Sequence, residues 1–183
     1  ITDIIQGAGL DQAVSSKAVK VFRRLAEAEA KAHGTAMDKI HFHEVGAVDT
    51  IVDVVCTVAG FHHLGVVEIH ASPVQLGTGF IKFTRGTMPV PAPATVNLLK
   101  GVPSYSTGIE AELTTPTGAA LLTSLASAYG PLPAGRIVEV GYGAGVRELP
   151  IPNLLRLILF EPMGNDEGIR PREEVELRSS TDL

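Results

Sequence analysis

Apolar side chains recur every three or four residues between about 14 and 33, which predicts an amphipathic helix with one buried face. Lysine, arginine and glutamate fill the opposite face, and Gly34 is placed to end the helix. The apolar positions are Val14, Ala18, Val21, Phe22, Leu25, Ala28 and Ala32. We interpret this helix as scaffold.

Strands and helices alternate in the next part of the chain. The predicted elements are a strand over 39–45, a helix from about 49 to 64, a half-buried strand over 66–76 and a strand over 80–84. The helix is apolar on most sides, which favours burial. In the strand 66–76, Val67, Ile69 and Ala71 share the face that we expect to be inward.

Two further helices are predicted to start at prolines, because proline suits the first helical turn. One begins within 89–95 and runs to Lys100, and the other follows Thr114-Thr115-Pro116 and runs over 119–129. Strands over 136–141 and 153–160 follow, the second apolar enough to be central in a sheet. The glycines at 141–145 predict a tight turn, since the prolines just after them preclude the helix that a dinucleotide fingerprint requires.

This order of elements predicts an α/β or α+β layered domain with a mixed β-sheet and flanking helices. We expect the domain to span 1–161 and a charged linker to span 162–183, where large apolar residues become rare.

The composition and net charge of the chain exclude several classes of function. The net charge of −5 argues against general nucleic-acid binding, and no apolar run is long enough to cross a membrane. The single cysteine, Cys56, excludes an internal disulfide framework and a thiolate zinc cage, and it fits a reducing cytoplasm. Cys56 lies inside an apolar helix, so we expect a buried and inert thiol; a metal path along Asp49, Asp53, Cys56 and His63 is the alternative.

Two imidazoles and three carboxylates fall between positions 41 and 53, and they are the strongest chemical signal in the chain. In a strand, His41 and His43 would share one face, about 7 Å apart. Asp49 and Asp53 would share one face of the following helix. Imidazole and carboxylate together, with Glu44, suit a divalent metal such as nickel, zinc or manganese. The alternative is two surface histidines followed by a helix capped by Asp49.

A second candidate site lies at Thr114-Thr115-Pro116-Thr117-Gly118. A helix N-terminus with threonine hydroxyls and a glycine that permits close approach can bind an anion, although plain helix capping explains the segment equally well. Lys82 and Arg85, on the preceding predicted hairpin, could add positive charge or could simply be solvated.

Three segments, KIHFHEVGAVDTIVDVV, GTMPVPAPATVNLLKGVP and ELTTPTGAALL, together resemble the nickel-insertion proteins of nickel-pincer nucleotide biosynthesis, the LarC family. The resemblance covers roughly 39 to 122. It implies a nickel chelatase that inserts nickel into a pyridinium mononucleotide with two thiocarboxylate arms and consumes cytidine triphosphate (CTP). It also implies a recipient enzyme such as lactate racemase.

The resemblance assigns His41, His43 and Glu44 to an HFHEVG motif, as transient nickel ligands, and Asp49 and Asp53 to its continuation. Thr114, Thr115, Thr117 and Gly118 match a TTPTGAA segment that we expect to hold the nucleotide phosphate. Family members carry a further N-terminal segment and a C-terminal half, to which the CTP site, with magnesium or manganese, is attributed. Because this chain lacks both segments, we expect it to be inactive alone. We also expect a homo-oligomeric, cytoplasmic protein.

Three alternatives remain open on the sequence. A metal-dependent hydrolase would use the histidine pair to activate water. A nickel carrier or storage module would bind ions without turnover. A purely structural domain would not need the histidines for metal binding.

Overall fold

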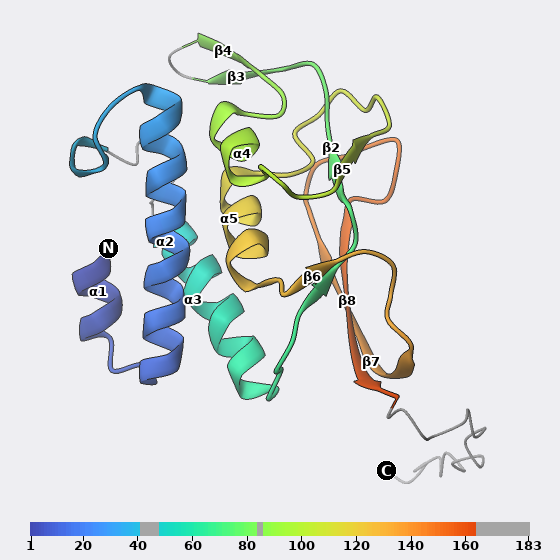
Figure 1. Cartoon of the computed structure of the whole chain (residues 1–183). Coiled ribbons are helices and arrows are strands. Elements are labelled where there is room, and N and C mark those ends of the chain that lie inside the picture. The colour runs from blue at the N-terminus through green and yellow to red at the C-terminus, as the bar shows by residue number, and fades with distance from the viewer. Residues whose placement is uncertain (41–47, 84–85, 164–183) are drawn as a thin grey trace, which may run out of the picture. The chain divides into compact units, whose positions relative to one another are not determined.

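The computed structural model describes residues 1–40, 48–83 and 86–163. It divides into two compact units, Ile1–Leu132 and Pro133–Leu183, which are described separately. The predicted α/β class is confirmed in the first unit, where helices and short strands alternate (Figure 1).

The long helix predicted between 14 and 33 is confirmed as α2, Gln12–His33. Asp11 caps it, because its carboxylate accepts a hydrogen bond from the amide of Ala13 at 2.7 Å. Gly34 ends it in the left-handed conformation, with φ of 62°. The other helices of this unit are α1 (Thr2–Gly7), the 3₁₀ turn η1 (Met37–Lys39), α3 (Val48–His63), α4 (Pro93–Leu98) and α5 (Pro116–Leu125).

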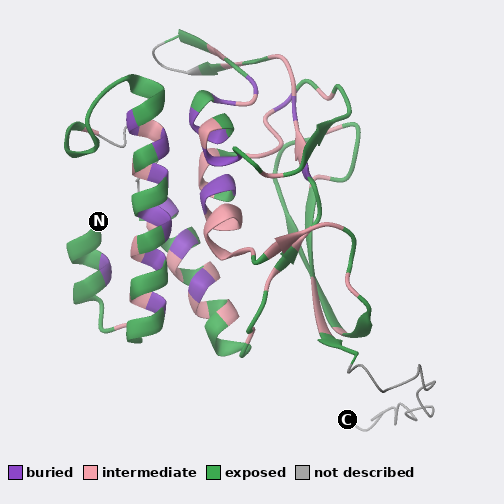
Figure 2. Cartoon of the chain, in the orientation of Figure 1, coloured by how far each residue is buried: buried purple, intermediate pink, exposed green. Residues whose placement is uncertain are grey.

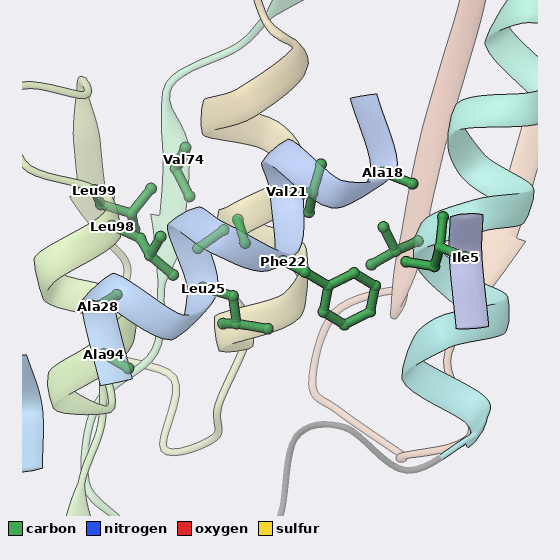
Figure 3. Close-up of a cluster of buried hydrophobic side chains, with 13 residues drawn as sticks. Ile5, Ala18, Val21, Phe22, Leu25, Ala28, Val74, Ala94, Leu98 and Leu99 are labelled. Carbon is green, nitrogen blue, oxygen red and sulfur yellow. The ribbon is translucent and has the colours of Figure 1, made fainter. Parts of the chain in front are cut away.

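The core of the first unit is built around the apolar face of α2, which packs against α3, α4 and α5. Val21 and Leu25 of α2 are fully buried and meet Val54 of α3 and Leu98 of α4 in one cluster (Figure 3). Figure 2 shows the buried positions along the inner sides of these helices. Burial of this apolar surface is the main stabilising term for the unit.

Short strands pair two by two beside the helices. β1 (His70–Ala71) is parallel to β6 (Ala128–Tyr129), and β2 (Val74–Leu76) is parallel to β5 (Ser104–Ser106). β3 (Phe80–Phe83) and β4 (Gly86–Pro89) form an antiparallel hairpin. Both parallel and antiparallel pairs occur, as a mixed sheet requires, but in the described residues they form separate two-stranded sheets.

Several predicted boundaries are wrong. The strand over 66–76 is reduced to β1 and β2, and Val67 is 95% exposed, so alternation alone did not indicate burial there. The helix over 119–129 ends at Leu125, because Tyr129 pairs with β1 instead. Helix α3 is less buried than its composition suggests, since Val48 and Val52 are exposed. Lys39 lies in η1, and positions 41–45 of the strand predicted there are outside the described residues.

The second unit contains an antiparallel ribbon of β7 (Gly135–Ala144) and β8 (Leu154–Pro162). The turn predicted at 141–145 is wrong for its first four positions, because β7 continues to Ala144 and Gly141 pairs with Leu157. The prediction that the last strand is central is also wrong in the described residues: β8 pairs with β7 alone, and Leu155 and Leu157 are at least half exposed.

Two other expectations concern the whole chain. No helix in the described ranges is long and apolar enough to cross a membrane. The linker predicted over 162–183 falls outside those ranges from 164 onward and stays a prediction.

Candidate functional site

The carboxyl ends of two parallel strands define one edge of the first unit. Gln75 of β2 is opposite Tyr105 of β5, and Leu76 is opposite Ser106. Because the strands run in the same direction, the loops that follow both of them leave at this edge. Ligand sites in α/β proteins form preferentially outside the carboxyl ends of parallel strands. We refer to residues 75–79, 105–111 and 114–118 as the carboxyl-edge site.

The loop Gly77–Gly79 is held against the loop that follows β5. The amide and the hydroxyl of Thr78 both donate to the carbonyl of Ile109, at 2.8 and 3.2 Å. The carbonyl of Gly79 accepts from the amide of Val90 at 2.9 Å. Gly79 has φ of 84°, a conformation that glycine adopts without strain. These bonds hold the loop after β2 in place at the carboxyl-edge site.

Side-chain hydrogen bonds connect the rest of this site. The hydroxyl of Thr114 donates to the carbonyl of Gln75 at 2.9 Å, which ties the segment before α5 to β2. The Gln75 side-chain amide donates to the Thr107 hydroxyl at 2.8 Å. Sequence reasoning did not identify Gln75 or Thr107, and no spacing in the sequence indicated that they meet.

The N-terminus of α5 has the geometry that the Thr-Thr-Pro-Thr-Gly segment predicted. Thr115 is the N-cap, and its hydroxyl accepts from the amide of Gly118 at 3.1 Å, with Pro116 in the first turn. The capping interpretation is therefore confirmed for Thr115. Within the first turn, Pro116 has no N–H and the amide of Gly118 is used by the cap, so the amide of Thr117 is the one that has neither an intrahelical nor a capping partner. Thr115 and Gly118 are exposed, so this helix terminus is open to an anion.

Lys82 and Arg85 were the predicted cationic partners of this terminus. Lys82 is exposed on β3, opposite Thr87 of β4. Arg85 lies outside the described residues.

The predicted nickel ligands are only partly described. Asp49 and Asp53 are both exposed on α3, one turn apart, as the sequence predicted. A carboxylate oxygen of Asp49 accepts from the amide of Thr50 at 2.8 Å. His41, His43 and Glu44 lie outside the described residues. Within 1–40, 48–83 and 86–163, no group of three or more His, Cys, Asp or Glu side chains is arranged to hold a metal ion.

Cys56 corrects one prediction. The thiol was expected to be buried, but Cys56 is exposed, because α3 buries only Thr50, Val54 and Val58. Asp49, Asp53, Cys56 and His63 therefore all lie on the exposed side of α3. No three of these four side chains are close enough together to hold a metal ion.

The described residues thus show an exposed, capped helix N-terminus at the carboxyl edge of a parallel strand pair and a helix with two exposed carboxylates. The chain belongs to the nickel insertion protein family, whose sequence model matches residues 1–182.

Curated relatives of this chain are named as nickel insertion proteins. The chain is 51% identical over its whole length to the pyridinium-3,5-bisthiocarboxylic acid mononucleotide nickel insertion protein of Desulfitobacterium hafniense strain DSM 10664 / DCB-2, and it covers 46% of that protein. It is 50% identical, over 88% of its length, to the protein of the same name from Nocardioides sp. strain ATCC BAA-499 / JS614, of which it covers 42%. A putative nickel insertion protein of Geobacter metallireducens is 47% identical over 96% of the chain, which covers 44% of that protein.

The chain thus spans about half the length of the curated relatives that it matches. No solved structure matches it.

Proposed function

We propose that this chain is the nickel-donating and substrate-binding half of a protein that inserts nickel into pyridinium-3,5-bisthiocarboxylic acid mononucleotide. The observation that carries the proposal is the identity of 51% over the whole chain with a relative that bears this name. The carboxyl-edge site supports it, because the substrate of that relative is a mononucleotide and an exposed helix N-terminus is a suitable place for a phosphate.

In this proposal His41, His43 and Glu44 bind Ni²⁺ transiently, and Asp49 and Asp53 either complete the ligand set or orient an imidazole. Since the described residues hold no three-ligand group, Asp49 and Asp53 require at least one further ligand, and the segment just before α3 supplies the candidates. Imidazole and carboxylate ligands suit a donor site, because the sulfur atoms of the substrate can displace them.

The phosphate of the substrate is proposed to bind at the first turn of α5. Thr117 offers a hydroxyl and an amide at this terminus, Gly118 has no side chain to obstruct a close approach, and the positive end of the helix dipole lies behind them. Lys82 and Arg85 are proposed to add positive charge for the anionic groups of the substrate, which are the phosphate and the two thiocarboxylate arms. Thr114 and Thr115 shape this turn through their hydrogen bonds to Gln75 and Gly118.

The remaining parts of the activity are proposals for the whole protein. We propose that the whole protein is a lyase-type chelatase. It would consume CTP, with magnesium or manganese, in the part of the relatives that this chain does not cover. It would deliver the product to an enzyme such as lactate racemase. Inactivity of the 183-residue piece alone, homo-oligomerisation and a cytoplasmic location also stay predictions; the single cysteine fits a reducing compartment.

Calorimetric titration of this chain with Ni²⁺ tests the donor site. We expect binding near neutral pH that is lost in the His41→Ala/His43→Ala double variant. The matched control is His62→Ala/His63→Ala, which removes two exposed histidines from the other end of α3 and should leave binding unchanged. Equal nickel affinity in all three proteins would overturn the donor site.

Nucleotide-binding and turnover assays, with Thr117 and Gly118 variants, distinguish the proposed function from a nickel carrier and from a hydrolase. A carrier would bind nickel without depending on Thr117 or Gly118, whereas a chelatase half should also bind a pyridinium mononucleotide through them. A hydrolase would turn over ester substrates when loaded with metal and without any nucleotide.

A further inference from the structure

The β3–β4 hairpin presents an aromatic ring and a cation on the same exposed face. The register pairs Phe80 with Pro89, Ile81 with Met88 and Lys82 with Thr87. Side chains alternate across a strand, so Ile81 and Met88, both half-buried, share the inner face. Phe80 and Lys82 share the outer face, where Phe80 is 75% exposed. Figure 2 shows the hairpin as a largely exposed element.

This hairpin starts directly at the carboxyl-edge site. Phe80 follows Gly79, whose carbonyl accepts from Val90 at 2.9 Å, and Thr78 is bonded twice to Ile109. The base of the hairpin is therefore fixed to the same loops that lead to α5 (Figure 1). The position of the Phe80 backbone is set by these bonds.

One acidic and one basic side chain lie near the start of the hairpin. A β-carbon added to Gly79 would lie 3.5 Å from the β-carbon of Glu110, so an exposed carboxylate side chain adjoins the residue before Phe80. Lys82 is two residues further, about 7 Å along the strand. The negative face of the exposed Phe80 ring favours a cation beside it. The Lys82 ammonium favours an anion two residues farther along β3.

We propose that the outer face of β3 receives the pyridinium ring of the substrate, with Phe80 against the ring and Lys82 paired with one of its anionic arms. The inference rests on the proposed function, which supplies a mononucleotide whose ring is cationic. A single exposed phenylalanine is ordinary. Here the charge pattern matches the ligand: an aromatic face attracts a cationic ring, and an ammonium two residues away meets an anionic substituent of that ring.

The absence of tryptophan from this chain permits a direct test. Phe80→Trp places a single indole on the hairpin, and a pyridinium ring stacked on indole quenches its fluorescence. The probe is nicotinic acid mononucleotide, which carries a pyridinium ring, one carboxylate and a phosphate. Saturable quenching is expected in Phe80→Trp. It is not expected in Val67→Trp, whose indole would be equally unique at a position that is 95% exposed.

Affinity measurements separate the ring from the phosphate. Phe80→Leu should weaken binding of nicotinic acid mononucleotide by about fivefold, which corresponds to a cation–π term of about 1 kcal/mol, and Phe80→Tyr should retain it. Neither change should alter the affinity for ribose 5-phosphate, which has no ring to stack.

Each outcome decides between the two proposals. If ribose 5-phosphate binds but Phe80→Leu leaves mononucleotide affinity unchanged, or if both tryptophan variants are quenched alike, the ring platform is wrong and the phosphate site stands. If neither ligand binds the unsubstituted chain, the ring platform and the phosphate site are both overturned, while the nickel-donor site is judged by the calorimetry alone.

Discussion

The carbonyl oxygen of Ala111 occupies the space that a β-carbon on residue 77 would need, and the side chain of Val90 closes the same space from another direction. Gly77 is therefore required for close backbone contact. This contact holds the loop after β2 against the loop that leads to Thr114, and so it positions the base of the β3–β4 hairpin relative to α5.

Gly77→Ala is expected to destabilise the protein by about 1–3 kcal/mol, because the added methyl group forces backbone apart. Gly60→Ala is the matched control. It adds the same group inside α3, where nothing lies within 4 Å, and should stabilise by about 0.5–1 kcal/mol. Urea unfolding measures both changes. Equal free energies of unfolding for the two variants would show that the loop after β2 accommodates the methyl group without strain.

Thr115→Ala is expected to cost about 1 kcal/mol, because it removes the N-cap hydrogen bond to the amide of Gly118. Thr115→Ser should restore most of that stability. Thr117→Ala should change the free energy of unfolding by less than about 0.5 kcal/mol and instead weaken ribose 5-phosphate binding. Unfolding and ligand titration of all three variants check this division. Loss of stability without loss of phosphate affinity in Thr117→Ala would contradict it.

Asp53→Asn tests whether the second carboxylate of α3 serves nickel. Asp53 is exposed, so the substitution should leave the urea midpoint nearly unchanged. Calorimetry should show nickel affinity lower by about tenfold, the size of effect expected for a ligand or a group that orients one. Asp3→Asn, an exposed change in the first turn of α1, is the control and should not alter nickel affinity. Unchanged affinity in Asp53→Asn would remove this residue from the site.

The interaction between Lys31 and Lys100 predicts that the stability of the folded protein changes at alkaline pH. Two effects of Lys31 lower the pKa of Lys100. The larger is a side-chain hydrogen bond, and the smaller is repulsion between the two like charges. When the pKa of a lysine is lower in the folded than in the unfolded state, folding disfavours the charged form of that lysine. The lysine therefore reduces the stability of the folded protein at neutral pH. This loss of stability disappears as the pH rises through the folded-state pKa. Lys31→Gln should raise the pKa of Lys100 and the thermal midpoint at pH 7.

Proton and carbon NMR titration of the lysine side chains measures the shift directly, with Lys20→Gln, another exposed change on α2, as the control. The pair is exposed, so the change in midpoint should be small and should diminish in high salt. A Lys100 pKa that does not move in Lys31→Gln would contradict the interaction.

Local sequence determined much of the helical part of this protein. Periodicity predicted α2 from about residue 14 to its end at Gly34, and the Thr-Pro pattern placed the start of α5 at Thr115, whereas the Asp11 cap of α2 was not predicted. The Thr-Thr-Pro-Thr-Gly segment is local as well, so its capping geometry followed from side chains within four residues of each other. Such features depend on short-range hydrogen bonds and on the helical repeat, which the sequence contains directly.

Tertiary structure decided what lies between these elements. Nothing in the sequence pairs Gln75 with Tyr105 and Thr107, or shows that Gly77 meets Ala111, because those contacts join segments about thirty residues apart. The apolar residues of α3 and β8 predicted more burial than occurs, since the period of a pattern shows which residues share a face but not whether another element covers it. The carboxyl-edge site exists only because parallel pairing of β2 and β5 brings their following loops to one edge.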